Sequence, residues 1–450
     1  MSAQPWSASL EADLRETAVR VALDVAGRLR APDRVEVAVH EAERQGDAAT
    51  RAPWVPFSLT SGHAGLALLH GHLDLCFPGA GWGDAALSAL ETAIEAAEAA
   101  DSVELGVASG LCGLALAVHM LAHPDGGYEE LLQSLDELLA QGQVARIDAL
   151  RGARSGFAPD VFDALAGLSG VARYWLLRRG RAGTETPLRD AIAALVALAT
   201  PDGETPRWHT PQALMVPGAM AELFPGGYVD CGLAHGVAGP LCVLSLARQQ
   251  GVDSDGLAEA IRHLASWLSS SRCDDAWGIN WPYAVPLGAA GNAAVQPGSQ
   301  GPSREPARAG WCYGSPGVAR SLYLAGQALG RPDLCALGVQ AIDSALARPP
   351  QARRLSSMHL CHGQAGLLQI ALRFQQEVPQ ETRKRAVHEL AASILQHHAP
   401  DSLLGYRDAA PNGREVDEPA LLTGAPGIAL ALLAAACDVE PVWDCALLLS

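Results

Sequence analysis

Apolar and polar positions of this chain alternate in blocks of helical length. In one kind of block nearly every position is apolar, as in LALLHGHL (66–73) and LLQIALRF (367–374). In the other kind, Leu87, Leu90 and Ile94 share one helix face while Glu91 and Glu95 point elsewhere. The pattern predicts helices that are buried on all sides, alternating with helices that bury only one face.

A Gly-x-x-Gly step precedes each apolar block and recurs seven times. Its first glycines are Gly62, Gly110, Gly167, Gly236, Gly314, Gly363 and Gly424. Successive copies are 48 to 78 residues apart, which leaves room for two helices and their loops. An internal repeat of this length indicates a fold built from repeated helix pairs, so we predict an all-α fold. We expect the fold to be an α/α toroid of seven inner and seven outer helices.

The repeat also indicates the domain organisation. We expect an N-terminal helical segment over residues 1–50, followed by an α/α toroid domain over residues 51–450. Residues 272–307 are rich in Pro, Gly and aromatic residues and lack helical periodicity, so they predict an irregular loop or a small β-containing insertion.

Composition excludes several classes of protein. The net charge of −17 argues against binding nucleic acid, because a phosphate partner requires a basic face. Residues 419–437 are uncharged, but Gly424, Pro426 and Gly427 interrupt them, so we expect a buried helix and no transmembrane segment. Ten cysteines lack a paired framework and no export signal is visible, so we expect reduced thiols or metal ligands in a cytoplasmic protein.

Polar residues stand immediately before three of the seven steps. His235 precedes the fourth copy, Cys312 lies before the fifth, and Cys361 and His362 lie before the sixth. If the copies are equivalent, these side chains converge at one rim. Two thiolates and an imidazole suit zinc, and three protein ligands leave the open position that a catalytic zinc site keeps.

A zinc site of this composition suits the activation of a thiol. An unperturbed thiol has a pKa of roughly 8.5 and is largely protonated near neutrality, whereas coordination to a metal removes its proton. Two protein thiolates neutralise Zn²⁺, so a third thiolate from a substrate stays electron-rich and nucleophilic.

Other interpretations of the same residue types stay open. A single Cys in an apolar helix is most often a small core residue, and we expect this of Cys76, Cys112, Cys242, Cys335, Cys437 and Cys445. His359 is a competing ligand close to the Cys-His pair, and we expect it to face solvent instead.

The motifs AHG, WCYG and CHG, in this order on repeated Gly-x-x-Gly helices, resemble the LanC family of lanthionine synthetase cyclases. The resemblance covers residues 55–435 and all seven copies. It implies an α/α toroid and a zinc ion held by Cys312, Cys361 and His362, with one exchangeable ligand.

The same resemblance implies three catalytic residues. The family's histidine motif matches His235, and its aspartate motif matches residues 162–170 in register, which implies Asp163; Asp160 is the rival candidate. The family's arginine, four residues before the motif cysteine, matches Arg308. Phe162 and Ala309 depart from the residues usual at their positions.

The resemblance predicts a zinc-dependent lanthionine cyclase. A peptide Cys thiolate adds to the β-carbon of dehydroalanine or dehydrobutyrine, and the enolate that forms is protonated. His235 is the expected acid, or alternatively the base for the thiol, and Asp163 orients it. Arg308 polarises the acceptor carbonyl or forms a structural ion pair with Asp163.

The implied partners are a dehydrated precursor peptide and a complex with a separate dehydratase and a transporter. Two other functions stay open. One is a LanC-like protein that joins glutathione to proteins containing dehydroamino acids, and the other is a non-catalytic scaffold that zinc stabilises.

Overall fold

The computed structural model describes residues 5–45, 53–122, 127–152, 156–201, 205–215, 218–287, 305–409 and 414–450. These residues form eighteen α-helices and two small two-stranded sheets, so the fold is mostly helical. Among them, no helix is long and apolar enough to cross a membrane.

Each Gly-x-x-Gly step leads into a helix, as predicted. The seven helices are α3 (His63–Cys76), α5 (Leu111–Leu121), α8 (Leu168–Leu177), α11 (Ala238–Gln249), α13 (Ser315–Leu329), α16 (Gln364–Glu377) and α18 (Ala425–Ala436). In six of them the first glycine is the N-cap residue, whereas α11 begins two residues after Gly236. Every residue of α18 is buried, in agreement with the buried helix expected in the uncharged stretch 419–437.

The second glycine of the step is where neighbouring copies meet. A Cβ atom added at Gly317 would lie 2.5 Å from the carbonyl oxygen of Trp311 and 2.9 Å from Cβ of Leu233 in the preceding copy. Contacts this short do not occur between real atoms, so only glycine fits. The same clash with a carbonyl oxygen six residues earlier recurs at Gly65, Gly170 and Gly427, and the corresponding contact at Gly239 is tight, at 3.1 Å.

Most of the remaining helices bury a single face. They are α1 (Ala12–Leu29), α2 (Pro32–Gln45), α4 (Trp82–Glu98), α6 (Glu129–Gly142), α7 (Val144–Gly152), α9 (Glu185–Ala199), α12 (Leu257–Ser270), α14 (Pro332–Ala347) and α17 (Glu381–Gln396). Two short helices, α10 (Ala219–Leu223) and α15 (Pro350–Arg353), lie in connecting segments. In α12, for example, Ile261, Leu264 and Leu268 are buried, while Glu259 and Arg262 form an exposed ion pair.

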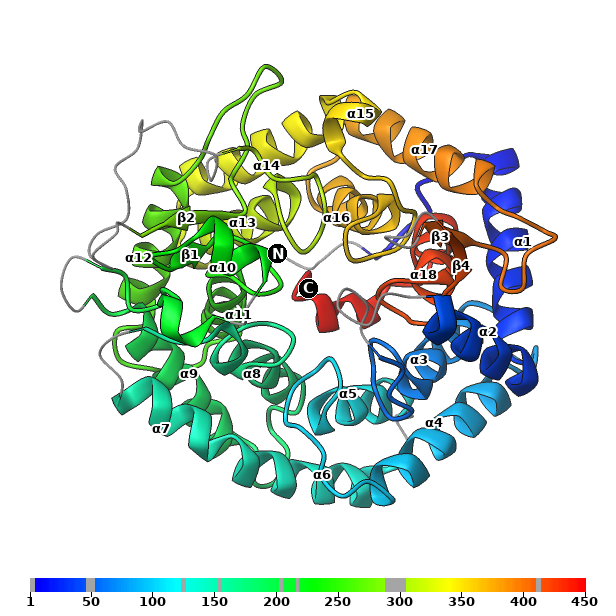
Figure 1. Cartoon of the computed structure of the whole chain (residues 1–450), viewed down its shortest axis with the longest axis horizontal. Coiled ribbons are helices and arrows are strands. Elements are labelled where there is room, and N and C mark those ends of the chain that lie inside the picture. The colour runs from blue at the N-terminus through cyan, green and yellow to red at the C-terminus, as the bar shows by residue number, and fades with distance from the viewer. Residues whose placement is uncertain are drawn as a thin grey trace. The chain divides into compact units, whose positions relative to one another are not determined.

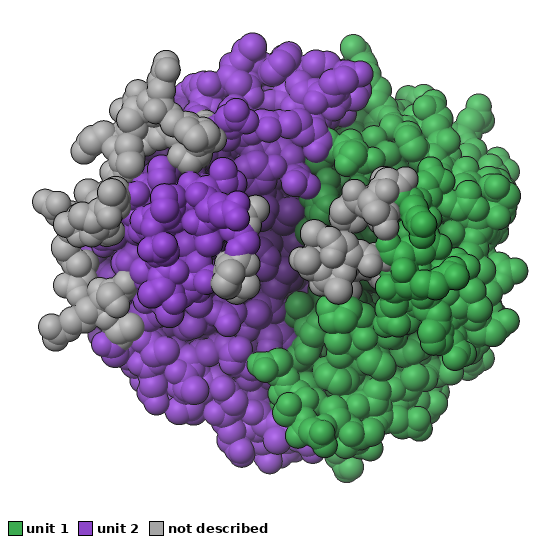
Figure 2. All heavy atoms as spheres, in the orientation of Figure 1, with its two compact units in different colours: residues 1–104, 108–132, 355–444 green, residues 105–107, 133–354, 445–450 purple. Residues whose placement is uncertain are grey.

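The chain divides into two compact units, coloured separately in Figure 2. Unit 1 comprises Met1–Glu104, Ala108–Leu132 and Leu355–Asp444, and unit 2 comprises Leu105–Val107, Gln133–Arg354 and Cys445–Ser450.

Each unit contains two layers of helices (Figure 1). In unit 1, α16, α18, α3 and α5 pack successively against one another, and α17, α1 and α4 cover them. In unit 2, α8, α11 and α13 form the buried layer, and α9, α12 and α14 cover it. The alternation of apolar and amphipathic blocks along the sequence therefore corresponds to the alternation of buried and covering helices within each unit.

Short antiparallel ribbons interrupt the helices. In unit 2, β1 (Tyr228–Asp230) pairs with β2 (Ala284–Pro286), with Val229 opposite Val285. In unit 1, β3 (Arg407–Ala409) pairs with β4 (Glu415–Asp417). Of the predicted insertion at 272–307, residues 288–304 lie outside the described residues. Strand β2 attaches the insertion to the segment immediately before the fourth Gly-x-x-Gly step.

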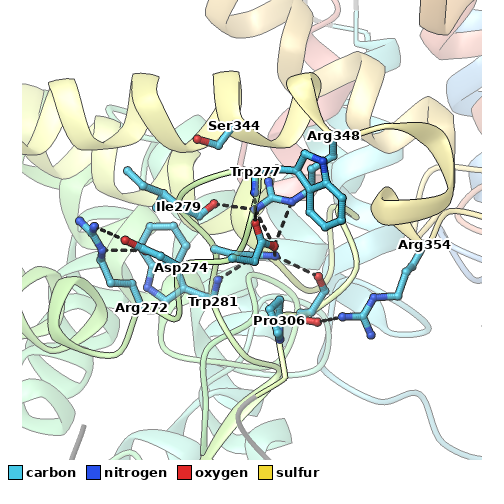
Figure 3. Close-up of polar contacts among 12 residues, drawn as sticks. Arg272, Asp274, Trp277, Ile279, Trp281, Pro306, Ser344, Arg348 and Arg354 are labelled. Carbon is cyan, nitrogen blue, oxygen red and sulfur yellow. Dashed lines mark hydrogen bonds and ion pairs between the residues drawn. The ribbon is translucent and has the colours of Figure 1, made fainter. Parts of the chain in front are cut away.

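A partly buried ion pair holds the insertion against α14 (Figure 3). Arg348, 1% exposed, follows the last residue of α14 and donates to both carboxylate oxygens of Asp275 at 3.0 Å and to the carbonyl of Ile279 at 3.0 Å. Burial favours a higher pKa for Asp275, but the Trp277 N–H and the Arg348 guanidinium hold the pKa below its ordinary value. Asn280 donates to the carbonyl of Ala307 at 3.4 Å, so both ends of the insertion are fixed.

Candidate functional site

His235 and Asp163 form an ion pair within unit 2. His235 lies in the turn between β1 and α11, and Asp163 lies between the short 3₁₀ helix Pro159–Val161 and α8. The Nδ1 atom of His235 is 2.7 Å from Oδ2 of Asp163. Asp163 is buried, whereas 41% of the His235 side chain is exposed. The rival Asp160 is exposed, so the structure pairs His235 with Asp163.

The backbone fixes the Asp163 carboxylate from its other side. Oδ1 of Asp163 accepts three N–H groups, from Leu165 at 3.0 Å, Ala166 at 2.7 Å and Gly167 at 2.8 Å. A Cβ atom at Gly167 would collide with the backbone N of Asp163. The first glycine of this copy therefore allows the turn that aims Oδ2 at His235.

The pair determines the protonation of His235. Burial disfavours the imidazolium, but the hydrogen bond and the charge of Asp163, and then the charge of Asp230, raise the pKa of His235 to about 9. The imidazole therefore carries a proton at neutral pH. Because Nδ1 is bonded to Asp163, Nε2 is the ring nitrogen left for another partner.

Asp230 is a second buried carboxylate near His235, and the sequence analysis did not identify it. It ends β1 and is 3% exposed. Its Oδ1 accepts the Gly232 N–H at 2.7 Å, and its Oδ2 accepts the Tyr313 hydroxyl at 3.0 Å. Burial raises the pKa of Asp230 to about 6, although these bonds oppose the rise. Asp230 thus connects the loop of His235 to the WCYG motif.

Arg308 reaches the same region through two tyrosines. Its Nε donates to the hydroxyl of Tyr283 at 3.0 Å, and its guanidinium lies 5.8 Å from the centre of that ring. The rings of Tyr283 and Tyr313 are 5.2 Å apart, and Tyr313 is 6.4 Å from the imidazole of His235. Aromatic contacts therefore connect Arg308 to His235 within unit 2, and the hydrogen bond of His235 connects both to Asp163.

The WCYG turn places Cys312 next to this group. Cys312 is buried, and its carbonyl accepts the Leu233 N–H at 2.9 Å, so the fourth and fifth copies are joined at this point. Gly314 has a φ of +105°, which L side chains rarely adopt, and a Cβ there would collide with the carbonyl oxygen of Arg308.

Cys361 and His362 lie in unit 1, in the turn before α16, and both are half-buried. The Cys361 N–H donates to the carbonyl of Leu422 at 2.9 Å, in the turn before α18. The expectation that His359 faces solvent is wrong. His359 is only 2% exposed, because the turn closed by Gly363 folds it inward, and its Nε2 is 3.4 Å from the Asp408 carboxylate. Its ring stands perpendicular to that of His362, with centroids 4.4 Å apart.

The three predicted zinc ligands are a set of donors that could hold a metal ion. Two thiols and one imidazole are soft and borderline ligands of the kind that zinc prefers, so the residues present fit zinc.

Comparison with known proteins assigns the family. The family model described as "Lanthionine synthetase C-like protein" matches residues 53–448. The chain belongs to the LanC-like family. It is 23% identical over 303 residues to the nisin biosynthesis protein NisC of Lactococcus lactis subsp. lactis, covering 66% of this chain and 69% of NisC. A solved structure of nisin cyclase matches with a TM-score of 0.74 and 22% identity, covering 92% of this chain and 96% of that one. This likeness shows that the fold is shared.

Four of the six cysteines expected in the core of this LanC-like chain are buried, namely Cys112, Cys242, Cys437 and Cys445. Cys76 and Cys335 are only half-buried. Burial raises the pKa of Cys242 to about 12, so it stays a thiol at physiological pH.

Proposed function

We propose that this chain is a zinc-dependent lanthionine cyclase that closes thioether rings in a separately dehydrated peptide. The observation that carries the proposal is the His235–Asp163 pair, since it gives a chain of this family a protonated, positioned imidazole. We also infer that the helix layers close into an α/α toroid over residues 51–450. The seven copies and the shared fold of nisin cyclase support this inference.

We further propose that Cys312, Cys361 and His362 hold the zinc ion. The match between these donors and the ligand preferences of zinc supports the assignment, as does the position of each donor just before a Gly-x-x-Gly step. When bound, zinc with three protein ligands would keep a fourth position for a cysteine of the substrate and favour its thiolate form.

His235 is assigned to proton transfer. The substrate thiolate forms a bond to the β-carbon of the dehydroamino acid, and the π electrons move to the α-carbon and its carbonyl as an enolate. His235, protonated at neutral pH, donates the Nε2 proton to the α-carbon, which completes the thioether. Its raised pKa favours the role of acid over that of base. Asp163 holds Nδ1 and so keeps the ring oriented.

Arg308 and the tyrosines are assigned to the acceptor side. A guanidinium next to the acceptor carbonyl would stabilise the negative charge that develops on its oxygen. Tyr283 holds the Arg308 side chain through a hydrogen bond, and Asp230 holds Tyr313 in the same aromatic group. These contacts fix the positions of groups that would otherwise rotate freely.

A synthetic peptide containing one dehydroalanine and one free cysteine tests the proposal. Ring closure conserves mass, so the measurement is loss of the alkylatable thiol, followed by mass spectrometry after treatment with iodoacetamide. The wild-type protein with zinc should protect the thiol, and His235→Ala should not. Asp160→Asn is the control and should behave as wild type, because Asp160 is exposed. Equal protection of the thiol by wild type and His235→Ala would contradict the proposal. If the protein added glutathione to the dehydroalanine faster than it closed the ring, glutathione would replace the peptide cysteine as the assigned thiol substrate.

A further inference from the structure

A cavity of about 560 Å³ lies in unit 1, between α2 and α4 and beside the start of α3. None of its lining residues belongs to the site described above. Its apolar walls include Val35, Trp54, Leu66 and Ala85. This volume lies within the range of pockets that bind small ligands or single side chains, roughly 300–1,000 Å³.

The imidazole of His70 lines this cavity and is only 2% exposed. Its Nδ1 has no hydrogen-bond partner among the described residues. Burial, with a smaller contribution from the charge of Arg30, lowers the pKa of His70 to about 4, so the ring is neutral at physiological pH. A buried polar group without a partner is costly, and a ligand that supplies one gains that free energy on binding.

The surroundings of His70 are aromatic. Its ring stacks on Trp82 with centroids 5.7 Å apart and an interplanar angle of 11°. The Arg30 guanidinium lies 5.8 Å from the centre of the Trp82 ring. Trp54 meets His63 edge-on at 5.4 Å, and burial lowers the pKa of His63 as well. The interior is therefore aromatic and uncharged, with unused hydrogen-bonding capacity.

The charged lining residues lie at the exposed rim. Arg30 contributes one positive charge there, and Glu36 and Asp84 contribute two negative charges. The guanidinium of Arg30 is engaged by the face of Trp82, and the rim carries a net negative charge. The free carboxylate of an amino acid would therefore be repelled there. A capped peptide backbone carries no such charge. The hydroxyl side chains of Ser88 and Thr92 on the α4 side are suitable partners for its amide groups.

We propose that this cavity binds an aromatic side chain bearing a hydrogen-bonding group, a phenol or an indole, carried on a peptide. The ring lies between the apolar walls, and its polar group bonds to the His70 imidazole. The peptide backbone crosses the rim. This binding site is separate from the proposed cyclase residues and does not depend on their function.

The probes are N-acetyl-L-tyrosinamide and N-acetyl-L-phenylalaninamide, titrated into the full chain by calorimetry. One hydrogen bond to a buried partner should make the tyrosine probe bind roughly three- to tenfold more tightly. His70→Phe keeps a ring against Trp82 and should abolish this preference while leaving the affinity for the phenylalanine probe unchanged. Free L-tyrosine should bind more weakly than its capped form; tighter binding of the free amino acid would overturn the peptide assignment.

A second variant locates the binding independently of His70. Ser88→Trp places a large side chain on the exposed wall of the cavity and should abolish binding of both probes. Leu87→Trp is the matched control, because Leu87 is also exposed on α4 but does not line the cavity. Circular dichroism verifies that each variant is folded. Absence of saturable binding to the wild type, equal affinity for the two capped probes, or unchanged binding by Ser88→Trp would each overturn the proposal.

Discussion

Nδ1 of His235 lies 2.7 Å from Oδ2 of Asp163, and this contact joins the turns that precede α11 and α8. The Asp163 carboxylate is fixed by three backbone N–H groups on its other oxygen. The bond to Nδ1 in turn fixes the orientation of the His235 ring. Part of the His235 side chain nevertheless remains exposed. A buried carboxylate that orients a partly exposed imidazole is an arrangement suited to proton transfer rather than to stability alone.

Replacing His235 with Ala should separate catalysis from metal binding. The rate of ring closure should fall by roughly 10²- to 10⁴-fold, since this is the usual contribution of a positioned acid or base. Zinc content should stay at the wild-type level, because His235 is not among the proposed ligands. Thiol alkylation measures the first quantity and metal analysis the second. A variant that loses its zinc would identify His235 as a ligand instead.

The pH dependence of ring closure should report the Asp163 contact. The folded pKa of His235 is raised from 6.5 to about 9, so the acid form is present below pH 9 and is lost as the pH rises through that value. Asp163→Asn removes the charge that raises this pKa. The alkaline limb should therefore move toward pH 6.5, and the maximal rate should also fall. Nuclear magnetic resonance of the labelled histidine gives the pKa directly, and an unchanged pKa in the variant would disprove the coupling.

Asp230→Asn should act on the same histidine more weakly. The charge of Asp230 contributes to the raised pKa of His235 without a direct hydrogen bond between the two side chains, so its loss should lower that pKa by less than Asp163→Asn does. An Asn side chain keeps a carbonyl oxygen that can accept the Gly232 N–H, and its amide N–H can donate to the Tyr313 hydroxyl oxygen, so the fold should be retained. Titration of His235 in both variants shows which substitution lowers its pKa more. A larger fall in the His235 pKa in Asp230→Asn than in Asp163→Asn would contradict this prediction.

The helices of the seven copies were predictable because their signals are local. A glycine and the apolar block that follows it lie within one short segment, and the carbonyl contact at Gly317 involves a residue only six positions earlier. Even here the start of α11 differs by one residue from the other copies, since both Gly236 and Val237 precede the helix.

The site was less predictable, because its contacts join distant residues. The Asp230–Tyr313 bond spans 83 positions, and no spacing rule relates the two, although both lie in or beside motifs that the sequence analysis considered. Asp163 was identified only through resemblance, since its partner is 72 positions away. The inward position of His359 depends on a tight turn and on Asp408, and its polar sequence context gave no indication of either.

The Arg348–Asp275 pair should be important for stability. Arg348→Met leaves the partly buried Asp275 carboxylate without its ion-pair partner, and we expect a loss of about 1–3 kcal/mol because the Trp277 N–H still binds the carboxylate. Arg262→Met is the matched control, because the Arg262–Glu259 pair is exposed to solvent and should contribute little to stability. Thermal and denaturant unfolding compare the two, and the double variant Arg348→Met/Asp275→Asn should recover part of the loss. Equal destabilisation by Arg348→Met and Arg262→Met would show that the pair does not anchor the insertion.

Removing one proposed zinc ligand should abolish metal binding without unfolding the chain. Cys361→Ser replaces a thiol by a hydroxyl, which is a poor ligand for zinc, so the purified variant should contain little zinc and should not close rings. Its circular dichroism should match that of the wild type, because the seven apolar helices bury the core without contributions from Cys361. Cys335→Ser is the control for losing a half-buried thiol, and its zinc content and activity should be unchanged. The release of zinc from wild type by a chromogenic chelator gives a stoichiometry that does not depend on activity. Full zinc occupancy in Cys361→Ser, or equal loss of zinc in both variants, would disprove the assignment of Cys361 as a ligand.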